Sequence, residues 1–356
     1  MKFWERFSYH VSLYMLCLAS RFEARKENTV LLAAPLFLGD LCMALPAISL
    51  MRAARPDFKF ILIVRSDLKE VCSSLRGFDR IIPFEKTGTF VASLHDERAK
   101  YGVCLFQERF VSILKRLSVP NIIFLSNLLK SEEPCKLEMP APDLLLKLAS
   151  EFCETNRPLQ RVDQQLVPWQ PLPRSKRKLP EKYAVIHCDG RSYFKKLPAW
   201  LIEEILRELE QKEVSAVLTG QWVDVATQFS GRCADLRGLT SLIDVLAISQ
   251  SAQCVFGPDT GVTHFSASNK VPTWVALGPS GNVPYGESGL IPSRIVWGLP
   301  DLDCRRDERL HGIELIRQMN CKGCQCRNKI RGYCLSITHK ASAGNSISAF
   351  VNRLEI

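Results

Sequence analysis

The chain has 356 residues, and at about 100–200 residues per domain this length predicts two domains. Hydrophobic residues make up 46% and charged residues 24%, which is typical of a folded globular protein and excludes a fibrous, low-complexity or wholly disordered chain. The net charge of +10 points to an anionic partner such as nucleic acid, an acidic membrane surface or a phosphorylated small molecule, unless it only solvates the surface.

Residues 1–29 form an N-terminal extension with an apolar stretch at 11–20. A signal peptide is one interpretation, because Lys2 and Arg6 precede that stretch. An amphipathic helix on a membrane surface is a second, and a helix packed on the body of the protein is a third, because apolar residues recur at helical spacing. These residues are Trp4, Phe7, Val11, Tyr14, Leu18 and Phe22. No run reaches the ~18 apolar residues of a membrane-spanning helix.

Short apolar runs alternate with helical patterns in residues 30–166, which predicts βαβ units, a parallel sheet and a first domain. The expected strands are 30–34, 59–64, 80–83, 103–106 and 121–124, and the expected helices are 40–52 and 66–75. Pro46 lies within the first of these helices and predicts a kink or a later start.

The segment 167–182 is rich in proline and basic residues, as linkers are. The alternation begins again in residues 183–303 and predicts a second domain. Its expected strands are 183–187, 214–219, 254–257 and 273–277, and its expected helices are 199–211, 241–249 and 262–268. The sequence therefore predicts an α/β fold of two facing Rossmann-like domains with parallel sheets, and a ligand in the cleft between them, beyond the carboxyl ends of the strands.

Ten of the 14 cysteines are scattered singly, often in apolar runs, which indicates reduced thiols and a cytoplasmic protein. The other four lie in the C-terminal segment 304–356, where we also expect a helix. They are Cys321, Cys324, Cys326 and Cys334. Four such thiols suit a structural zinc ion, with Cys304 and His339 as further candidate ligands. The spacing lacks a second Cys-x2-Cys pair, so reduced thiols are the alternative.

Residues 259–264 follow an expected strand and open an expected helix. Asp259 or Thr260 can cap that helix, and Gly261 leaves room for close approach. The amides at the helix N-terminus favour an anion by roughly 0.3–1 kcal/mol. This pattern predicts a phosphate site, and an ordinary capped helix is the alternative.

The loop 188–198 also lies between a strand and a helix. It carries three cations and two hydroxyls, among them Ser192 and Lys195, and lysine binds phosphate as a point charge. A second phosphate-binding loop is one interpretation, and a solvated basic loop is the other.

A third loop, residues 38–40, places a carboxylate after the first strand. Asp40 there would suit a general base, a role worth about 10²–10⁴ in rate. The alternative is that Asp40 only caps the helix that follows.

Taken together, these loops resemble glycosyltransferase family 9, the ADP-heptose:lipopolysaccharide heptosyltransferases. The resemblance covers about residues 30–279, and its stretches occur in the family's order. They are 38–40 with 44–47, 195–198, 218–220, 236–242, 259–264 and 277–280. Leu197 stands where the family has tryptophan, and this departure, with Pro258, would reshape the donor pocket and suit another sugar.

The resemblance implies a GT-B fold and an inverting, metal-independent glycosyltransferase that needs no cofactor for catalysis. It would move a heptose or similar sugar from a nucleotide diphosphate donor such as ADP-heptose to a lipopolysaccharide-core acceptor. Asp40 would be the general base, with Gly39 shaping its loop, and Asp224 would be a candidate for the ribose. The donor-binding residues that it implies are Ser192, Lys195, Thr219, Gly220, Asp259, Thr260, Gly261, Val262, Thr263 and His264.

The resemblance also implies a monomer on the inner face of the inner membrane, with a lipid-linked saccharide acceptor and no nucleic acid. A non-catalytic binding or assembly protein on the same fold at the membrane surface is the alternative function. An NAD(P)-dependent enzyme is disfavoured because no G-x-G-x-x-G follows the first strand of either domain. Nucleic-acid binding rests only on net charge and the basic cluster 174–178.

Overall fold

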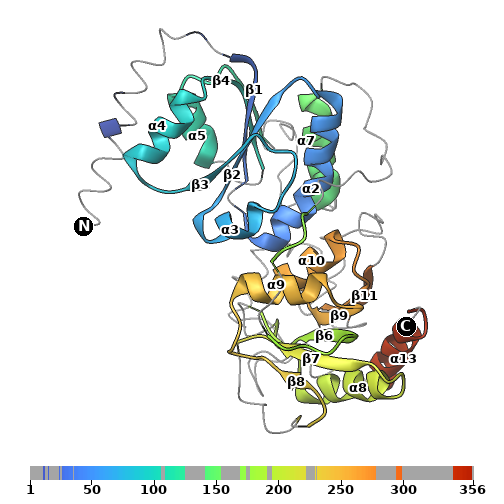
Figure 1. Cartoon of the computed structure of the whole chain (residues 1–356). Coiled ribbons are helices and arrows are strands. Elements are labelled where there is room, and N and C mark those ends of the chain that lie inside the picture. The colour runs from blue at the N-terminus through green and yellow to red at the C-terminus, as the bar shows by residue number, and fades with distance from the viewer. Residues whose placement is uncertain are drawn as a thin grey trace, which may run out of the picture. The chain divides into compact units, whose positions relative to one another are not determined.

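The computed structural model describes most of the chain in two compact units, which divide between Gln170 and Pro171 (Figure 1). The described residues are 11–12, 15, 24, 26–34, 36–105, 109–124, 141–153, 169–173, 177–190, 195–221, 229, 231–277, 294–298 and 340–354. The last residues of the first unit and the first residues of the second unit each make a contact within their own unit. Trp169 forms a β-bridge with Leu75, and the Leu172 amide donates to Gln250 Oε1 over 2.8 Å.

The described part of the first unit contains a five-stranded parallel sheet in the order β3-β2-β1-β4-β5. Its strands are β1 (Lys26–Ala33), β2 (Lys59–Arg65), β3 (Arg80–Phe84), β4 (Ala99–Cys104) and β5 (Asn121–Phe124). Strands β1 and β4 begin four residues earlier than expected, at 26 rather than 30 and at 99 rather than 103. The first residues of these two strands, Lys26 and Ala99, pair with each other. The start of β1 is exposed and is not part of an apolar run, so the sequence pattern does not predict it.

Helices cover both faces of this sheet (Figure 1). Helices α2 (Leu38–Ala54) and α7 (Ala141–Phe152) lie side by side, and α4 (Gly88–Asp96) and α5 (Arg109–Arg116) pack against the other face. Helix α2 begins two residues before the expected start and contains Pro46, so a start after this proline is wrong.

The expected helix at 66–75 is present only in part, from 66 to 72. The chain forms a 3-10 turn, η1 (Ser66–Leu68), and one turn of helix, α3 (Lys69–Cys72). Leu75 then forms the β-bridge to Trp169, and a residue paired in this way cannot continue the helix. The hydroxyls of Ser73 and Ser74 bond to the Glu70 and Val71 carbonyls where the helix ends, and the bridge at Leu75 prevents it from reaching 75.

One buried carboxylate holds the amino-terminal ends of two strands in the first unit. Lys59 is the first residue of β2, and Arg80 is the first residue of β3. Glu97 accepts hydrogen bonds from Lys59 Nζ at 2.8 Å and from Arg80 Nη1 at 2.7 Å. Burial raises the pKa of Glu97, and the bonds from Lys59 and Arg80 lower it, with a net lowering. These ion pairs lie at the edge of the sheet opposite the carboxyl ends of the strands. We therefore expect them to stabilise the fold rather than to bind a ligand.

The second unit contains a six-stranded parallel sheet among its described residues, in the order β11-β10-β9-β6-β7-β8. Its strands are β6 (Tyr183–His187), β7 (Ser215–Thr219), β8 (Ala234–Asp235), β9 (Cys254–Pro258), β10 (Thr273–Leu277) and β11 (Arg294–Gly298). Read from β8, this is the 3-2-1-4-5-6 order of the Rossmann fold, and the first sheet shows the first five positions of the same order. The predicted α/β fold of two Rossmann-like domains is confirmed, and the cleft stays a prediction.

Helices α8 (Ala199–Glu210) and α13 (Lys340–Val351) lie side by side on one face of this sheet (Figure 1). They pack with sheet residues such as Phe256 and Trp274, which are fully buried. Helix α9 (Leu242–Gln250) packs against the other face, and α10 (Gly261–Ser268) packs on α9. Both faces of the sheet are therefore covered, which is why its strands read as continuous apolar runs.

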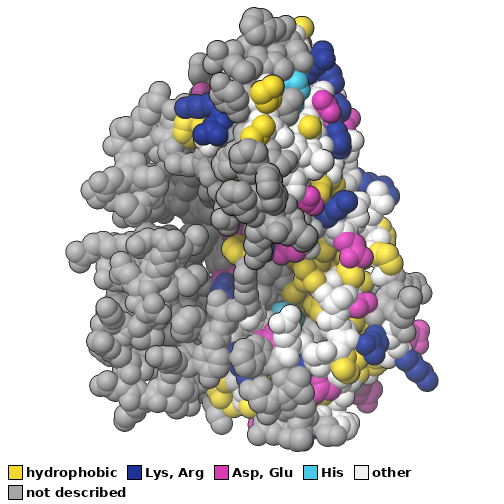
Figure 2. Space-filling view, turned by 90° about the vertical axis from the view of Figure 1, so that its left-hand side faces the viewer, with side chains coloured by type: hydrophobic (Ala, Val, Ile, Leu, Met, Phe, Trp, Pro, Cys, Tyr) yellow, Lys and Arg dark blue, Asp and Glu magenta, His cyan; other side chains and the backbone are white. Residues whose placement is uncertain are grey.

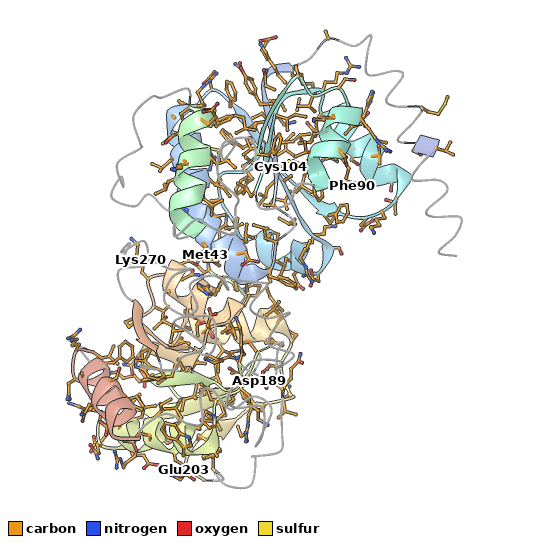
Figure 3. The ribbon with its side chains drawn as sticks, turned by 180° about the vertical axis from the view of Figure 1, so that it is seen from behind. Met43, Phe90, Cys104, Asp189, Glu203 and Lys270 are labelled. Carbon is orange, nitrogen blue, oxygen red and sulfur yellow. The ribbon has the colours of Figure 1, made fainter. Side chains whose placement is uncertain are left out.

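No described helix is both long enough and apolar enough to cross a bilayer. On the face drawn in Figure 2, the described Lys and Arg side chains are interspersed with Asp and Glu side chains rather than gathered in one patch. The stick view in Figure 3 shows side chains such as Phe90 and Cys104 filling the interior of the first unit, where both are buried.

Candidate functional site

The second sheet changes direction of winding between β6 and β9. These strands are neighbours, but the chain adds β7 and β8 on one side and β10 and β11 on the other. Loops that leave the carboxyl ends of two such strands diverge, and the crevice that they form is where open α/β sheets bind ligands. Lys195 follows β6 and Asp259 follows β9, so the topology brings the two sequence-predicted phosphate loops to one place.

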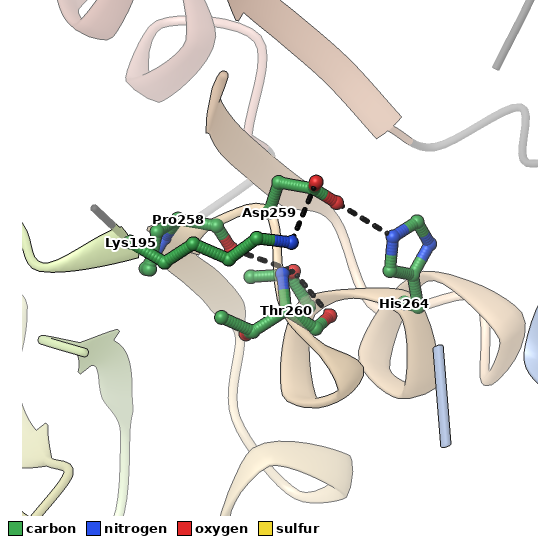
Figure 4. A network of polar contacts seen from close by, with 6 residues as sticks. Lys195, Pro258, Asp259, Thr260 and His264 are labelled. Carbon is green, nitrogen blue, oxygen red and sulfur yellow. Dashed lines mark hydrogen bonds and ion pairs between the residues drawn. The ribbon is translucent and has the colours of Figure 1, made fainter. Parts of the chain in front are cut away.

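Asp259 is the centre of a polar network in this place (Figure 4). One carboxylate oxygen, Oδ2, accepts a hydrogen bond from Lys195 Nζ at 2.9 Å, and the other, Oδ1, lies 2.9 Å from His264 Nε2. The side chains of Asp259 and His264 are 3% and 4% exposed, whereas that of Lys195 is 26% exposed. Asp259 therefore holds a lysine whose ammonium group still reaches solvent.

The start of α10 lies beside this network. The Thr260 amide donates to Thr263 Oγ1 over 3.2 Å, and the first bond within the helix runs from the His264 amide to the Thr260 carbonyl over 3.1 Å. The amides of Gly261 and Val262 precede that bond and are among the first amides of a helix, which have no acceptor within it. Such amides, with the positive end of the helix dipole, make an anion-binding site.

The two loops are in direct contact through glycines. A Cβ atom added to Gly190 would lie 2.6 Å from Thr260 Cγ2 and 3.2 Å from Lys195 Cβ. One added to Gly257 would lie 2.9 Å from Thr263 Cγ2. These two glycines were not predicted as site residues from the sequence. The available signal was a glycine within a strand, or a few residues after one, where a phosphate-type loop follows.

The carboxyl end of β7, the neighbour of β6 in the sheet, also lies at this site. Thr219 is fully buried, and its Oγ1 lies 3.0 Å from His187 Nδ1. Burial lowers the pKa of His187 to about 4, and the charge of Asp189 opposes this effect, so the imidazole is neutral at neutral pH. Thr219 therefore contributes its side chain to the support of β6, and Gly220 is the first residue beyond the strand.

In the first unit, Asp40 follows β1, which lies between β2 and β4 at the corresponding change of winding. Asp40 is the third residue of α2 and is half-buried, and Gly39 precedes it in the same helical turn. Both residues thus lie in the first turn of the helix and not in a preceding loop. A carboxylate there is favoured by the helix dipole, whether or not it has a chemical role.

Several predicted residues lie outside the part of the chain that the structure describes. They are Ser192, Asp224, Cys304, Cys321, Cys324, Cys326, Cys334 and His339, with most of the N-terminal extension. Within the described residues, no group of three or more His, Cys, Asp or Glu side chains is arranged to hold a metal ion. The described cysteines are all free thiols, as the sequence predicts for the scattered ones.

Solved structures share this fold. The glycosyl transferase family 9 protein of Veillonella parvula superposes with a TM-score of 0.68 at 14% identity, covering 92% of this chain and 99% of that one. The E. coli ADP-heptose lps heptosyltransferase II gives a TM-score of 0.62 at 15% identity, covering 92% of this chain and 100% of that one. E. coli heptosyltransferase WaaC with ADP gives 0.59 at 17% identity, covering 76% and 93%.

No protein-family model and no curated protein matches the chain by sequence. The likeness is therefore one of three-dimensional structure, and it covers between 76% and 92% of this chain. It agrees with the resemblance carried by the strand-end loops, and it shows that this chain has the fold of the glycosyltransferases of family 9.

Proposed function

We propose that this protein is an inverting glycosyltransferase that moves a heptose or a similar sugar from a nucleoside diphosphate donor to a saccharide acceptor. The observation that carries the proposal is the network of Lys195, Asp259 and His264 beside the start of α10, at the change of winding of the second sheet. Solved structures of the same fold include E. coli WaaC with ADP and with ADP-2-deoxy-2-fluoro heptose.

The donor diphosphate binds at the amides of Gly261 and Val262, with Lys195 as its cation. Lys195 is suited to this because Asp259 fixes its position while a quarter of its side chain stays exposed. As the bond from the sugar to the diphosphate breaks, negative charge grows on the leaving oxygen. Prealigned amides and an ammonium group stabilise that charge without reorganising, which is the usual way that enzymes favour such a leaving group.

The acceptor hydroxyl loses its proton to Asp40 and attacks the anomeric carbon from the face opposite the diphosphate. The new bond joins the acceptor oxygen to the anomeric carbon, and the old bond breaks with its electron pair on the nucleoside diphosphate. Asp40 ends protonated and returns its proton to solvent. General base catalysis of this kind is worth about 10²–10⁴ in rate.

The acceptor in this proposal is a lipid-linked saccharide of the lipopolysaccharide core, and the protein works as a monomer at the inner face of the membrane. The net charge of +10 supports an acceptor or a surface that carries negative charge. The donor in this proposal is ADP-heptose, and the departure at Leu197 makes a panel of donors necessary.

The test measures binding and transfer separately. ADP, UDP and GDP are titrated by calorimetry, and sugar transfer from ADP-heptose to a deheptosylated core acceptor is followed by mass spectrometry. We expect one nucleoside diphosphate to bind and one product to form. If none of the three binds, the proposed donor site is wrong. If binding occurs without transfer to any core acceptor from a full donor panel, the non-catalytic binding protein replaces the enzyme.

A further inference from the structure

A second buried carboxylate, that of Asp189, lies in the loop after β6, beside the proposed donor site. Asp189 is the second residue after β6 and is 4% exposed (Figure 3). Its Oδ2 accepts a hydrogen bond from the backbone amide of Gln221 at 2.8 Å. Burial of a carboxylate is costly unless hydrogen bonds compensate it, so this contact with the loop after β7 is part of what holds Asp189 in place.

The same carboxylate fills the space over Gly220. A Cβ atom added there would lie 2.9 Å from Asp189 Oδ2 and 3.0 Å from its Cγ, and Gly220 has a φ of +135°, which side chains rarely adopt. From another side, the Gly238 amide donates to the Gly220 carbonyl over 2.7 Å. The loop formed by Gly220 and Gln221 is therefore fixed between Asp189 and Gly238.

The residue after Asp189 faces the diphosphate end of the site. Gly190 packs against Thr260 and Lys195 so closely that a Cβ atom would overlap with Thr260. Asp189 and Gly190 are adjacent in the chain, so together they join the loop after β7 to the start of α10.

We propose that Asp189 is a positioning residue for the donor. Its carboxylate holds Gly220 and Gln221 at a fixed place relative to Lys195 and α10, and this place sets how well the nucleoside is bound once the diphosphate is seated. The inference rests on the proposed function, because it requires that a nucleoside diphosphate bind here. It assigns Asp189 to the nucleoside half of the donor and not to the diphosphate half.

The decisive comparison uses two ligands and three variants. Asp189→Ala removes the acceptor for the Gln221 amide, and Asp189→Asn keeps an acceptor oxygen of the same size. Asp79→Ala is the matched control, because Asp79 Oδ2 also accepts a backbone amide, that of Phe60 at 2.8 Å, but in the first unit. The ligands are ADP and inorganic pyrophosphate, and only ADP carries a nucleoside.

We expect Asp189→Ala to weaken ADP binding about tenfold, the effect of losing one hydrogen bond to a charged group, and to leave pyrophosphate binding within about twofold. In the transfer assay, KM for the donor rises and kcat changes less. Asp189→Asn restores most of the ADP affinity, and Asp79→Ala changes neither ligand. Equal weakening of both ligands by Asp189→Ala, or of neither, overturns the positioning role.

A measurement without ligand separates this inference from the proposed function. Amide hydrogen exchange at Gln221 is expected to be about tenfold faster in Asp189→Ala than in the wild type. Unchanged exchange overturns the inference even if ADP binds, and a wild type that binds neither ligand overturns the proposed function while the exchange result stands. Should Asp189→Ala fail to fold, Gly220→Ala serves instead. Its Cβ atom displaces the loop from Asp189, and the same selective loss of ADP affinity is expected.

Discussion

The buried imidazole of His187 predicts how the second unit loses stability in acid. Burial lowers the pKa of His187 to about 4, from an ordinary value of 6.5. In the unfolded chain the same imidazole is hydrated and regains its ordinary pKa. Between these two values the unfolded state binds a proton that the folded state does not, so stability falls as the pH falls through this window.

The size of the effect follows from the difference of about 2.5 units between the two pKa values. At about 1.4 kcal/mol for each unit, the folded second unit loses about 3 kcal/mol between neutral pH and the folded pKa. Above the unfolded pKa the stability contributed by a neutral His187 is fully present. A loss of this size is a large part of the stability of an ordinary domain, about 5–15 kcal/mol.

The assay compares the wild type with His187→Asn by urea denaturation at several pH values between about 4 and 7. Asparagine cannot titrate there, and its amide can still pair with Thr219 Oγ1. The variant is less stable at neutral pH because it fills less of the core, but we expect it to lose about 3 kcal/mol less than the wild type on acidification. Exchange of amides in β6 and β9 reports the second unit alone. Parallel pH profiles for the two proteins would refute the burial argument.

Three further predictions concern other parts of the chain. Glu97→Gln removes the charge that binds Lys59 and Arg80, and we expect urea denaturation to show that the first unit loses about 1–2 kcal/mol of its free energy of unfolding. On acidification the variant should lose less stability than the wild type. Equal stability of the two proteins would contradict the role given to these ion pairs. Lys195→Ala removes the exposed cation at α10, and calorimetry is expected to show ADP affinity at least about tenfold lower, whereas unchanged affinity would exclude Lys195 from the donor site. If the four cysteines Cys321, Cys324, Cys326 and Cys334 bind zinc, elemental mass spectrometry should find about one zinc ion per chain in protein produced with zinc present. If no zinc is found, these cysteines are reduced thiols.

The sequence predicts the type of most elements but not how they assemble. The strand at 183–187 was predicted to the residue, because all five positions of β6 are buried and read as one apolar run. Strand β8 was missed, since Ala234 and Asp235 are only two residues and half-buried, with no periodicity to detect. Its presence is explained by pairing with Val217 and Leu218 of β7, a contact between segments about 17 residues apart.

The site shows the same division. Asp259 and Lys195 were predicted as neighbours of a phosphate because each loop carries a local signal, an acidic helix start or a group of cations. That their side chains bond each other at 2.9 Å follows from the positions of β6 and β9 in the sheet, which the order of residues does not give. Thr219 stays a predicted donor residue, but the sequence does not predict that its hydroxyl is buried 3.0 Å from His187 Nδ1, because burial is a property of the assembled unit.

Asp40 is the residue for which the local explanation and the chemical one must be separated by experiment. As an acidic residue in the first turn of α2, it stabilises the helix dipole by about 0.3–1 kcal/mol, and loss of its charge affects only stability. As the general base, its loss lowers kcat by about 10²–10⁴ and leaves the affinity for ADP unchanged.

Asp40→Asn removes the base and keeps the size and polarity of the side chain. Asp67→Asn is its control, since Asp67 is an acidic residue in the 3-10 turn η1 of the same unit, where it pairs with Arg65. A general base predicts that only Asp40→Asn loses turnover, with a change in stability no larger than that of the control. If both variants keep full turnover, the carboxylate of Asp40 serves the helix alone, and another group must accept the proton of the acceptor hydroxyl.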